Sequence, residues 1–190
     1  EEGTAAGTIR VALLNNGYMQ ANVQLADDTY FDFDPVLVNA SQIDTVEELN
    51  AYDVVVIGDS TSHSQLVTIA PALRAWVEGG GGVVGVGWLV LAAGNYYGYI
   101  PDIDAIIPVQ TNASHTYYSN ASLTITDGTH PVTEGVTTFT ASGYTEYSSL
   151  GADAGALAAE DTLDLAQVAA EGGRDAGLRA AVGEIDGADA

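Results

Sequence analysis

Asp59, His130 and Glu146 are the residues of this sequence best suited to acid–base chemistry. Carboxylates and imidazoles are the side chains that most often exchange a proton with a substrate near neutral pH. Hydrolysis of a glycosidic bond, for example, uses two carboxyl groups that lie within about 10 Å of each other. The three residues are far apart in the sequence, so this chemistry requires a fold that brings them into one cleft.

Covalent catalysis finds little support in the residue types present. The chain contains no cysteine, which excludes a thiolate nucleophile, a thiolate metal site and a disulfide. Ser60 precedes His63 by three residues, but this spacing across the start of a helix does not by itself align a hydroxyl with a base. Non-covalent ligand contacts are expected just after the predicted strands, because ligands of parallel sheets collect at the carboxyl ends of the strands. The residues expected to make them are Asn16, Tyr18, Ser60, Gly87 and Trp88.

Aromatic side chains are dense in the second half of the chain. Together with Trp88 they could line a cleft for a sugar, since aromatic rings stack on pyranose faces and carboxylates accept hydrogen bonds from hydroxyl groups. Tyrosine is equally suited to the half-buried edge of a β-sheet, so both interpretations stay open. The tyrosines concerned are Tyr96, Tyr97, Tyr99, Tyr117, Tyr118, Tyr144 and Tyr147.

Four aspartates are the only candidates for a metal site. Asp27, Asp28, Asp32 and Asp34 lie within eight residues of one another. Carboxylate oxygens at this density can ligate a hard cation such as calcium. The spacing does not match the EF-hand loop, and a solvated acidic loop is the alternative.

The charge of the chain restricts its partners and its surroundings. Twenty-six acidic residues stand against four basic ones, all arginine, and the formal net charge is −22. Such a surface repels the phosphate backbone of nucleic acids, which excludes them as partners. It suits an extracellular or cell-surface protein bathed in calcium, which we favour, or the salt-rich cytoplasm of a halophile. No apolar run reaches the roughly 18 residues of a membrane span, and three glycosylation sequons begin at Asn39, Asn112 and Asn120.

The order of apolar segments predicts an α/β fold. After a linker at residues 1–7, strands are expected at 8–14, 33–38, 53–58 and 83–87, and helices at 45–52, 63–78 and 88–93. Pro71 is expected to kink the second helix or to mark its start. Continuous apolar strands alternating with helices indicate a mainly parallel sheet covered on both faces. We therefore expect residues 8–190 to form one flavodoxin-like three-layer domain, with antiparallel edge strands at 122–127 and 141–149.

Two motifs in this framework resemble the class I glutamine amidotransferase-like superfamily, and its ThuA-like branch in particular. The first is the glycine-rich segment from Glu78 to Trp88, which follows a long helix; the second is the turn Asp127-Gly-Thr-His130-Pro131. The resemblance covers residues 8–139. It implies a sharp elbow with a nucleophilic cysteine, and this sequence has Gly87 at that position. A His-x-Glu pair is also missing, so the resemblance implies a member without glutaminase activity.

Two functions are compatible with these observations. The first is a non-catalytic amidotransferase-like module of a larger extracellular or cell-surface protein, with a role in binding, spacing or assembly. Its partners would be neighbouring domains or copies of that protein, and it would need no cofactor other than calcium. Members of the resembled family end on a further apolar strand, so either the chain is truncated near Ala190 or a partner supplies that edge. The second function is a carbohydrate-directed enzyme that uses Asp59, His130 and Glu146 as acid and base.

Overall fold

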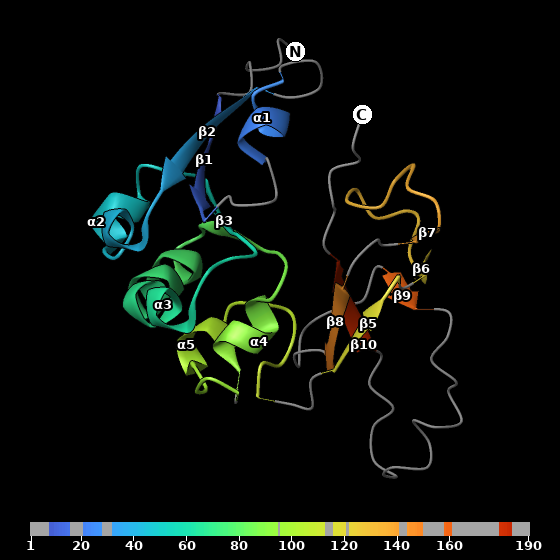
Figure 1. Ribbon diagram of the computed structural model, residues 1–190. Helices are drawn as coiled ribbons and strands as arrows, with labels where there is room; N and C mark the ends of the chain where they lie inside the picture. Colours follow the sequence, from blue (N-terminus) through green and yellow to red (C-terminus); the bar gives the residue numbers. More distant parts are fainter. Residues whose placement is uncertain are drawn as a thin grey trace.

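The computed structural model of the protein shows a parallel sheet with helices beside it and antiparallel strands in the C-terminal half (Figure 1). It describes residues 8–15, 21–27, 32–94, 96–112, 116–120, 122–140, 144–149, 158–160 and 179–183. The elements of the first half are β1 (Ile9–Leu14), α1 (Ala21–Leu25), β2 (Phe33–Val38), η1 (Ala40–Gln42), α2 (Val46–Leu49), β3 (Val54–Ile57), α3 (His63–Glu78), β4 (Gly82–Gly85), α4 (Leu89–Ala93) and α5 (Pro101–Asp104).

The central sheet is parallel and has the strand order β2-β1-β3-β4. This is the order of the flavodoxin-like fold, in which the chain changes direction between β1 and β3. The predicted α/β fold class is therefore confirmed. Each of the four strands predicted from apolar runs is present, because a strand covered on both faces needs apolar side chains at successive positions.

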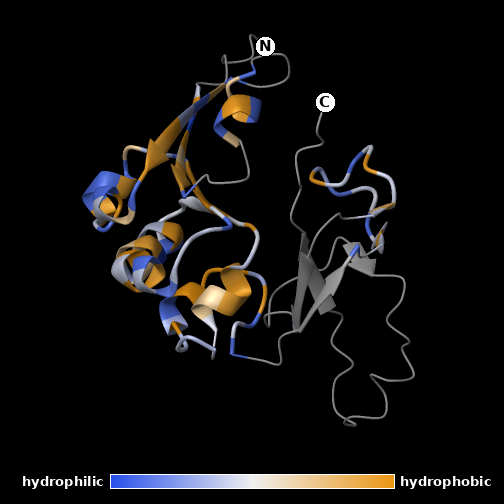
Figure 2. Ribbon diagram, viewed as in Figure 1, coloured by the Kyte–Doolittle hydropathy of each residue, from blue (hydrophilic) through white to orange (hydrophobic). Residues whose placement is uncertain are grey.

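The two faces of the sheet are packed by different helices. Ala12 and Leu14 point to one face, where they pack with Ile57 and the buried side of α3 in the larger apolar core. Val11 and Leu13 alternate with them and point to the other face, near α1. Figure 1 shows α1 on one side of β1 and β2, and α2 and α3 on the other. In Figure 2 the strands β1 and β2 are mostly hydrophobic, whereas α2 and α3 carry both kinds of residue.

Helices α2 and α3 begin where the sequence provides a capping box. Thr45 accepts a hydrogen bond from the backbone of Glu48, and Ser62 does the same for Gln65. In each pair the second side chain also accepts a hydrogen bond from the backbone of the first. These reciprocal bonds satisfy amide groups that a helix start would otherwise leave without partners.

The expected interruption of α3 at Pro71 does not occur, because one helix runs from His63 to Glu78 with Pro71 inside it. Proline removes the hydrogen bond to the carbonyl of Val67. Both Pro71 and Val67 are exposed, so water can satisfy that carbonyl. Leu66 before Pro71 and Leu73 after it both belong to the buried face of α3, so packing keeps the helix continuous through the proline.

The antiparallel strands of the C-terminal half form two sheets of their own and do not extend the parallel sheet. Their orders are β10-β8-β5 and β7-β6-β9. The backbone amide of Gln110 donates to the carbonyl of Ser149 at 2.8 Å, which joins the segment after α5 to β8. No described helix is long and apolar enough to cross a membrane. The strands are β5 (Thr116–Ser119), β6 (Ser122–Ile125), β7 (Phe139–Thr140), β8 (Tyr144–Ser149), β9 (Ala158–Glu160) and β10 (Arg179–Gly183).

Candidate functional site

The candidate site lies at the carboxyl ends of the parallel strands, beyond β3 and β4. Ligands of open α/β sheets collect beyond the carboxyl ends of the strands. The end of β3 also lies close to the end of β1: Gly58 donates its amide to the carbonyl of Leu14 at 2.8 Å. A Cβ at Gly58 would overlap the carbonyl oxygen of Asn15, so the close approach of these two backbone segments requires glycine at position 58.

A pocket of about 640 Å³ opens at this edge of the sheet. That volume is within the range of small-molecule sites. Hydroxyl groups come from the turn before α3 and from its first residues, and aromatic rings come from the elbow after β4 and the segment after α4. The lining residues are Asp59, Ser60, Thr61, Ser62, His63, Ser64, Trp88, Leu91, Ala92 and Tyr97.

The elbow after β4 places Gly87 directly against Asp59. Gly87 has a φ of +62°, in the left-handed region. A Cβ on this residue would overlap the Oδ1 atom and the Cβ of Asp59. The same Oδ1 accepts a hydrogen bond of 3.2 Å from the backbone amide of Trp88. The space where a nucleophilic side chain would project from the elbow is therefore filled by a carboxylate.

The sequence suggested His63 only as a possible base for Ser60, a pairing that its spacing did not support, and the structure places His63 in the lining of the same pocket as Asp59. Its Nδ1 atom lies 2.9 Å from the carbonyl oxygen of Ala92. The ring is stacked with that of Tyr97 at a centroid distance of 6.5 Å. Gly98 lies beside the imidazole with a φ of +127°, and a Cβ there would be 3.2 Å from His63 Cε1. The signal in the sequence was its position as the first residue of a helix that follows a strand.

Three exposed tyrosines follow α4, and one of them, Tyr97, lines the pocket. The exposed fractions are 77% for Tyr96, 58% for Tyr97 and 41% for Tyr99. Tyr96 packs edge-on against Tyr97 with ring centroids 4.8 Å apart. Large exposed aromatic side chains that gather in one place are typical of binding surfaces. The other predicted aromatic residues, on β5 and β8, have side chains outside the described part of the structure.

The carboxylate of Asp104 holds the side chain of Tyr99 in place. The hydroxyl of Tyr99 donates to Asp104 Oδ2 at 2.9 Å. The hydrogen bond to Asp104, with partial burial and the carboxylate charge, raises the pKa of Tyr99. Asp104 Oδ1 also accepts hydrogen bonds from the amide and the hydroxyl of Thr111. Through Asp104, Tyr99 before α5 is therefore connected to Thr111 after it.

Of the predicted site residues, the structure places Asp59, Ser60 and Trp88 in the lining of the pocket. Gly87 lies behind Asp59, whereas Asn16 and Tyr18 fall outside the described residues. Of the other two predicted acid–base residues, His130 is not among the described residues of the lining, and the side chain of Glu146 lies outside the described part of the structure.

His130 and Glu146 belong to the C-terminal half. His130 lies in the turn between β6 and β7, where its Nδ1 accepts a hydrogen bond from the amide of Val132. Glu146 is on β8, paired along the backbone with Tyr117 and Val182, and its side chain is not described. The titratable side chain that shares the pocket with Asp59 is thus His63.

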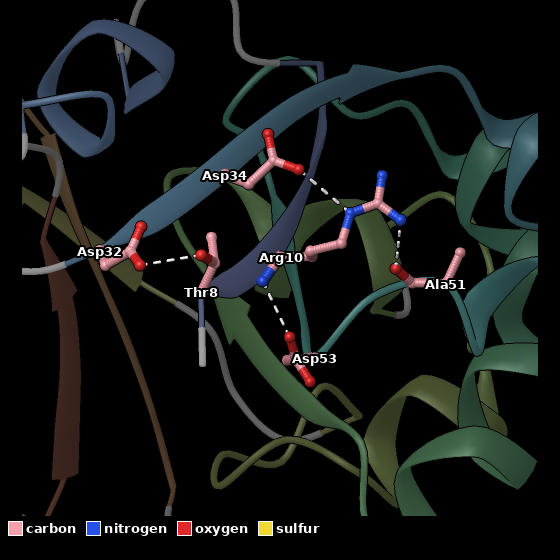
Figure 3. A network of polar contacts seen from close by, with 6 residues as sticks. All are labelled: Thr8, Arg10, Asp32, Asp34, Ala51 and Asp53. Carbon is pink, nitrogen blue, oxygen red and sulfur yellow. Dashed lines mark hydrogen bonds and ion pairs between the residues drawn. The ribbon is translucent and has the colours of Figure 1, made fainter. Parts of the chain in front are cut away.

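Two of the predicted calcium ligands, Asp32 and Asp34, lie at the amino end of β2 (Figure 3), and a third, Asp27, follows α1. Asp32 accepts a hydrogen bond from Thr8 at 2.8 Å, and Asp34 forms an ion pair with Arg10 at 3.1 Å. Asp28 lies outside the described residues. Within the part of the chain that the structure describes, no three potential ligands are grouped as a metal ion would require. Calcium binding by this loop stays a prediction.

No protein-family model and no curated protein matches the sequence. The fold is similar to that of a cytoplasmic protein from Salmonella typhimurium LT2, with a TM-score of 0.62 and 14% identity over 81% of this chain and 80% of that one. A second Salmonella typhimurium cytoplasmic protein gives a TM-score of 0.58 and 13% identity over 80% and 79% of the two chains. A ThuA-like protein from Bacteroides uniformis gives 0.53 and 17% identity over 79% and 65%. These similarities show a shared fold.

Proposed function

We propose that the chain is a non-catalytic module with an amidotransferase-like fold, and that its pocket binds a small polyhydroxylated ligand such as a sugar. The observation that carries this proposal is the contact between Gly87 and Asp59. An acyl-transfer enzyme needs a nucleophile at the elbow and backbone N–H groups free to bind a developing oxyanion. Here a carboxylate takes the place of the nucleophile and accepts the hydrogen bond of the Trp88 amide.

The lining of the pocket supports a sugar-like ligand. Trp88 and Tyr97 provide aromatic faces, while Ser60 and Ser64 provide hydroxyl groups. Sugars bind to proteins through this combination, because their C–H faces pack on rings and their hydroxyl groups need hydrogen-bond partners.

Nuclear magnetic resonance titration with neutral monosaccharides and disaccharides tests this proposal. We expect backbone signals of residues 59–64, 88 and 97 to shift. Tyr97→Ala should weaken binding about tenfold, because it removes one stacking face. Phe139→Ala is the control, since Phe139 is also an exposed aromatic residue but lies on β7. If no sugar shifts these signals at millimolar concentration, the proposed binding function is wrong.

A carbohydrate-directed enzyme is the second candidate, and one observation favours it. Asp59 and His63 line the same pocket, so a carboxylate and an imidazole are available for proton transfer. Release of nitrophenol from nitrophenyl glycosides, abolished by Asp59→Asn, would support this candidate over the non-catalytic module. Unchanged release by the variant would assign the activity to a contaminant.

We also propose that the module belongs to an extracellular or cell-surface protein and contacts its neighbouring domains or copies. Support comes from the charge of −22 and the absence of lysine. Thermal unfolding in calcium chloride and in potassium chloride at equal ionic strength distinguishes the two surroundings. A melting temperature that rises more with calcium supports the extracellular location. An equal rise, from screening alone, supports the cytoplasm of a halophile.

A further inference from the structure

We infer that the pocket selects ligands that carry an ammonium group, so that amino sugars bind in preference to neutral or acidic sugars. This inference rests on the proposed function, because it specifies the charge of the ligand that the same pocket would bind. It is carried by three properties of the described lining: a carboxylate without an ion-pair partner, aromatic faces, and the lack of a permanent positive charge.

Asp59 is the only carboxylate among the described residues of the lining. Its Oδ1 accepts a hydrogen bond from the amide of Trp88. None of the three ion pairs among the described side chains includes Asp59. A carboxylate with an available oxygen at the floor of a pocket gains most from a ligand that brings a charged donor, since charge-assisted hydrogen bonds are about twice as strong as neutral ones.

The aromatic residues add attraction for the same kind of ligand. The faces of tryptophan and tyrosine rings carry negative electrostatic potential and attract ammonium groups within about 6 Å. Trp88 and Tyr97 line the pocket beside Asp59, and Tyr96 extends the aromatic surface by its edge-on contact with Tyr97. A neutral sugar would use these rings only for stacking, whereas an amino sugar would use both their faces and the carboxylate.

No permanent cation is among the described residues that line the pocket, and the side chains of Arg174 and Arg179 lie outside the described part of the structure. The chain has no lysine. Arg10 is paired with Asp34, and Arg74 is paired with Glu78 and Asp102, in both cases away from the lining residues. The net charge of −22 adds a field that repels anions and raises the local concentration of cations. A phosphate or carboxylate ligand would therefore lose hydration without gaining an ion pair.

His63 is the other titratable group among the described lining residues. Its hydrogen bond to Ala92 leaves the second ring nitrogen free to accept a hydrogen bond from a cationic ligand. Because the carbonyl oxygen of Ala92 can only accept, Nδ1 of His63 carries the hydrogen. The neutral ring then presents Nε2 as an acceptor, which can receive a hydrogen bond from an ammonium or a hydroxyl group. A metal ion is a poorer match than an ammonium ion, because calcium requires six to eight oxygen ligands and the lining supplies one carboxylate.

Isothermal titration calorimetry with glucose, glucosamine and glucuronate tests the inference on the unmodified chain. The three sugars have the same ring and differ mainly in charge. We expect glucosamine to bind about tenfold more tightly than glucose, and glucuronate more weakly than glucose. The preference for glucosamine should decrease as salt increases, because salt screens the ion pair in this open pocket.

Asp59→Asn identifies the residue responsible. Asparagine keeps an oxygen for the Trp88 amide and removes the charge, so we expect the affinity for glucosamine to fall to the level of that for glucose. Glu134→Gln is the matched control: it changes the net charge equally, at an exposed turn outside the pocket. The preference should remain in this variant.

The outcomes separate the inference from the proposed function. If none of the three sugars binds, the proposed sugar-binding function fails. If glucose or glucuronate binds as tightly as glucosamine, the pocket binds sugars but the inference about charge is wrong. The same conclusion follows if Asp59→Asn keeps the full preference.

Discussion

Nδ1 of His63 and the carbonyl oxygen of Ala92 lie 2.9 Å apart, and this contact links the first residue of α3 to the last turn of α4. Carbonyl groups in the last turn of a helix have no partner within the helix. The imidazole provides one for Ala92, so the two helices that border the pocket are held together by a side chain that also lines it.

The first prediction concerns the protonation of this ring. Because the carbonyl can only accept, neutral His63 should carry its hydrogen on Nδ1, the less common tautomer in free histidine. Nitrogen-15 spectra of the imidazole distinguish the two forms above pH 8. Resonances that place the hydrogen on Nε2 would contradict the contact. His115 and His130 serve as internal references.

The second prediction concerns Gly87. Gly87→Ala should lower the free energy of unfolding by about 2 to 4 kcal/mol, from a left-handed backbone that disfavours a side chain and from overlap with Asp59. Urea unfolding measures this change. Gly135→Ala is the control, since Gly135 has a φ of +78° and no atom near its Cβ position. The control should cost only about 1 to 2 kcal/mol.

Combining Gly87→Ala with Asp59→Gly tests the overlap directly. The second substitution removes the atoms in contact, so the two changes should together cost less than the sum of their separate effects. Additive costs would mean that Asp59 does not occupy the space beside residue 87.

The third prediction concerns Arg10, whose guanidinium makes two directional contacts. Nε pairs with Asp34 and an Nη atom donates to the carbonyl of Ala51 at 2.9 Å (Figure 3). The group also lies over the ring of Tyr52. Arg10→Lys keeps the net charge but cannot make this set of contacts. We expect the free energy of unfolding to fall by about 1 kcal/mol, since the ion pair is exposed.

Urea unfolding checks the arginine prediction, with Asp34→Asn as its partner. If Arg10→Lys costs no more than Asp34→Asn, the ion pair accounts for the whole effect. The carbonyl and ring contacts would then contribute nothing measurable.

The fourth prediction concerns pH. The hydrogen bond to Asp104 raises the pKa of Tyr99 above that of a free phenol. Because folding raises this pKa, the protonated phenol stabilises the folded protein. The stabilisation is fully present below the ordinary phenol pKa of about 10, and it is lost as the pH rises through the pKa of Tyr99 in the folded protein. The ζ-carbon resonance of Tyr99 should therefore titrate above pH 10. In Asp104→Asn the midpoint should return toward the ordinary value, and an unchanged midpoint would contradict the assignment to Asp104.

The sequence predicts the first half of the fold well because its signals there are local. The strand at Val54–Ile57 is a continuous apolar run, and the start of α3 is encoded by Ser62 and Gln65 within one turn. The segment of α5 has no such periodicity, and it was not predicted. β5, β9 and β10 were not predicted either, since such short strands are stabilised by partners distant in the sequence rather than by their own pattern.

The candidate site could be predicted only in part. Asp59, Ser60 and Trp88 follow strands, so the rule for parallel sheets finds them. Tyr97 was among the tyrosines expected to line a cleft with Trp88, and it does line the pocket. The place of His63 arises from its contact with the end of α4, which depends on packing. The close approach of Asp59 to Gly87 depends on the register between β3 and β4, in which Ile57 pairs with Gly85. No local pattern reveals that register.

The contact between Asp59 and Gly87 also restricts how this protein could evolve. A cysteine arriving first at position 87 would collide with the carboxylate, whose charge would also disfavour the thiolate form. Losing Asp59 first would remove a carboxylate from the lining of the pocket. A side chain at position 87 therefore requires changes at two positions, and neither change alone leaves the elbow and the pocket as they are.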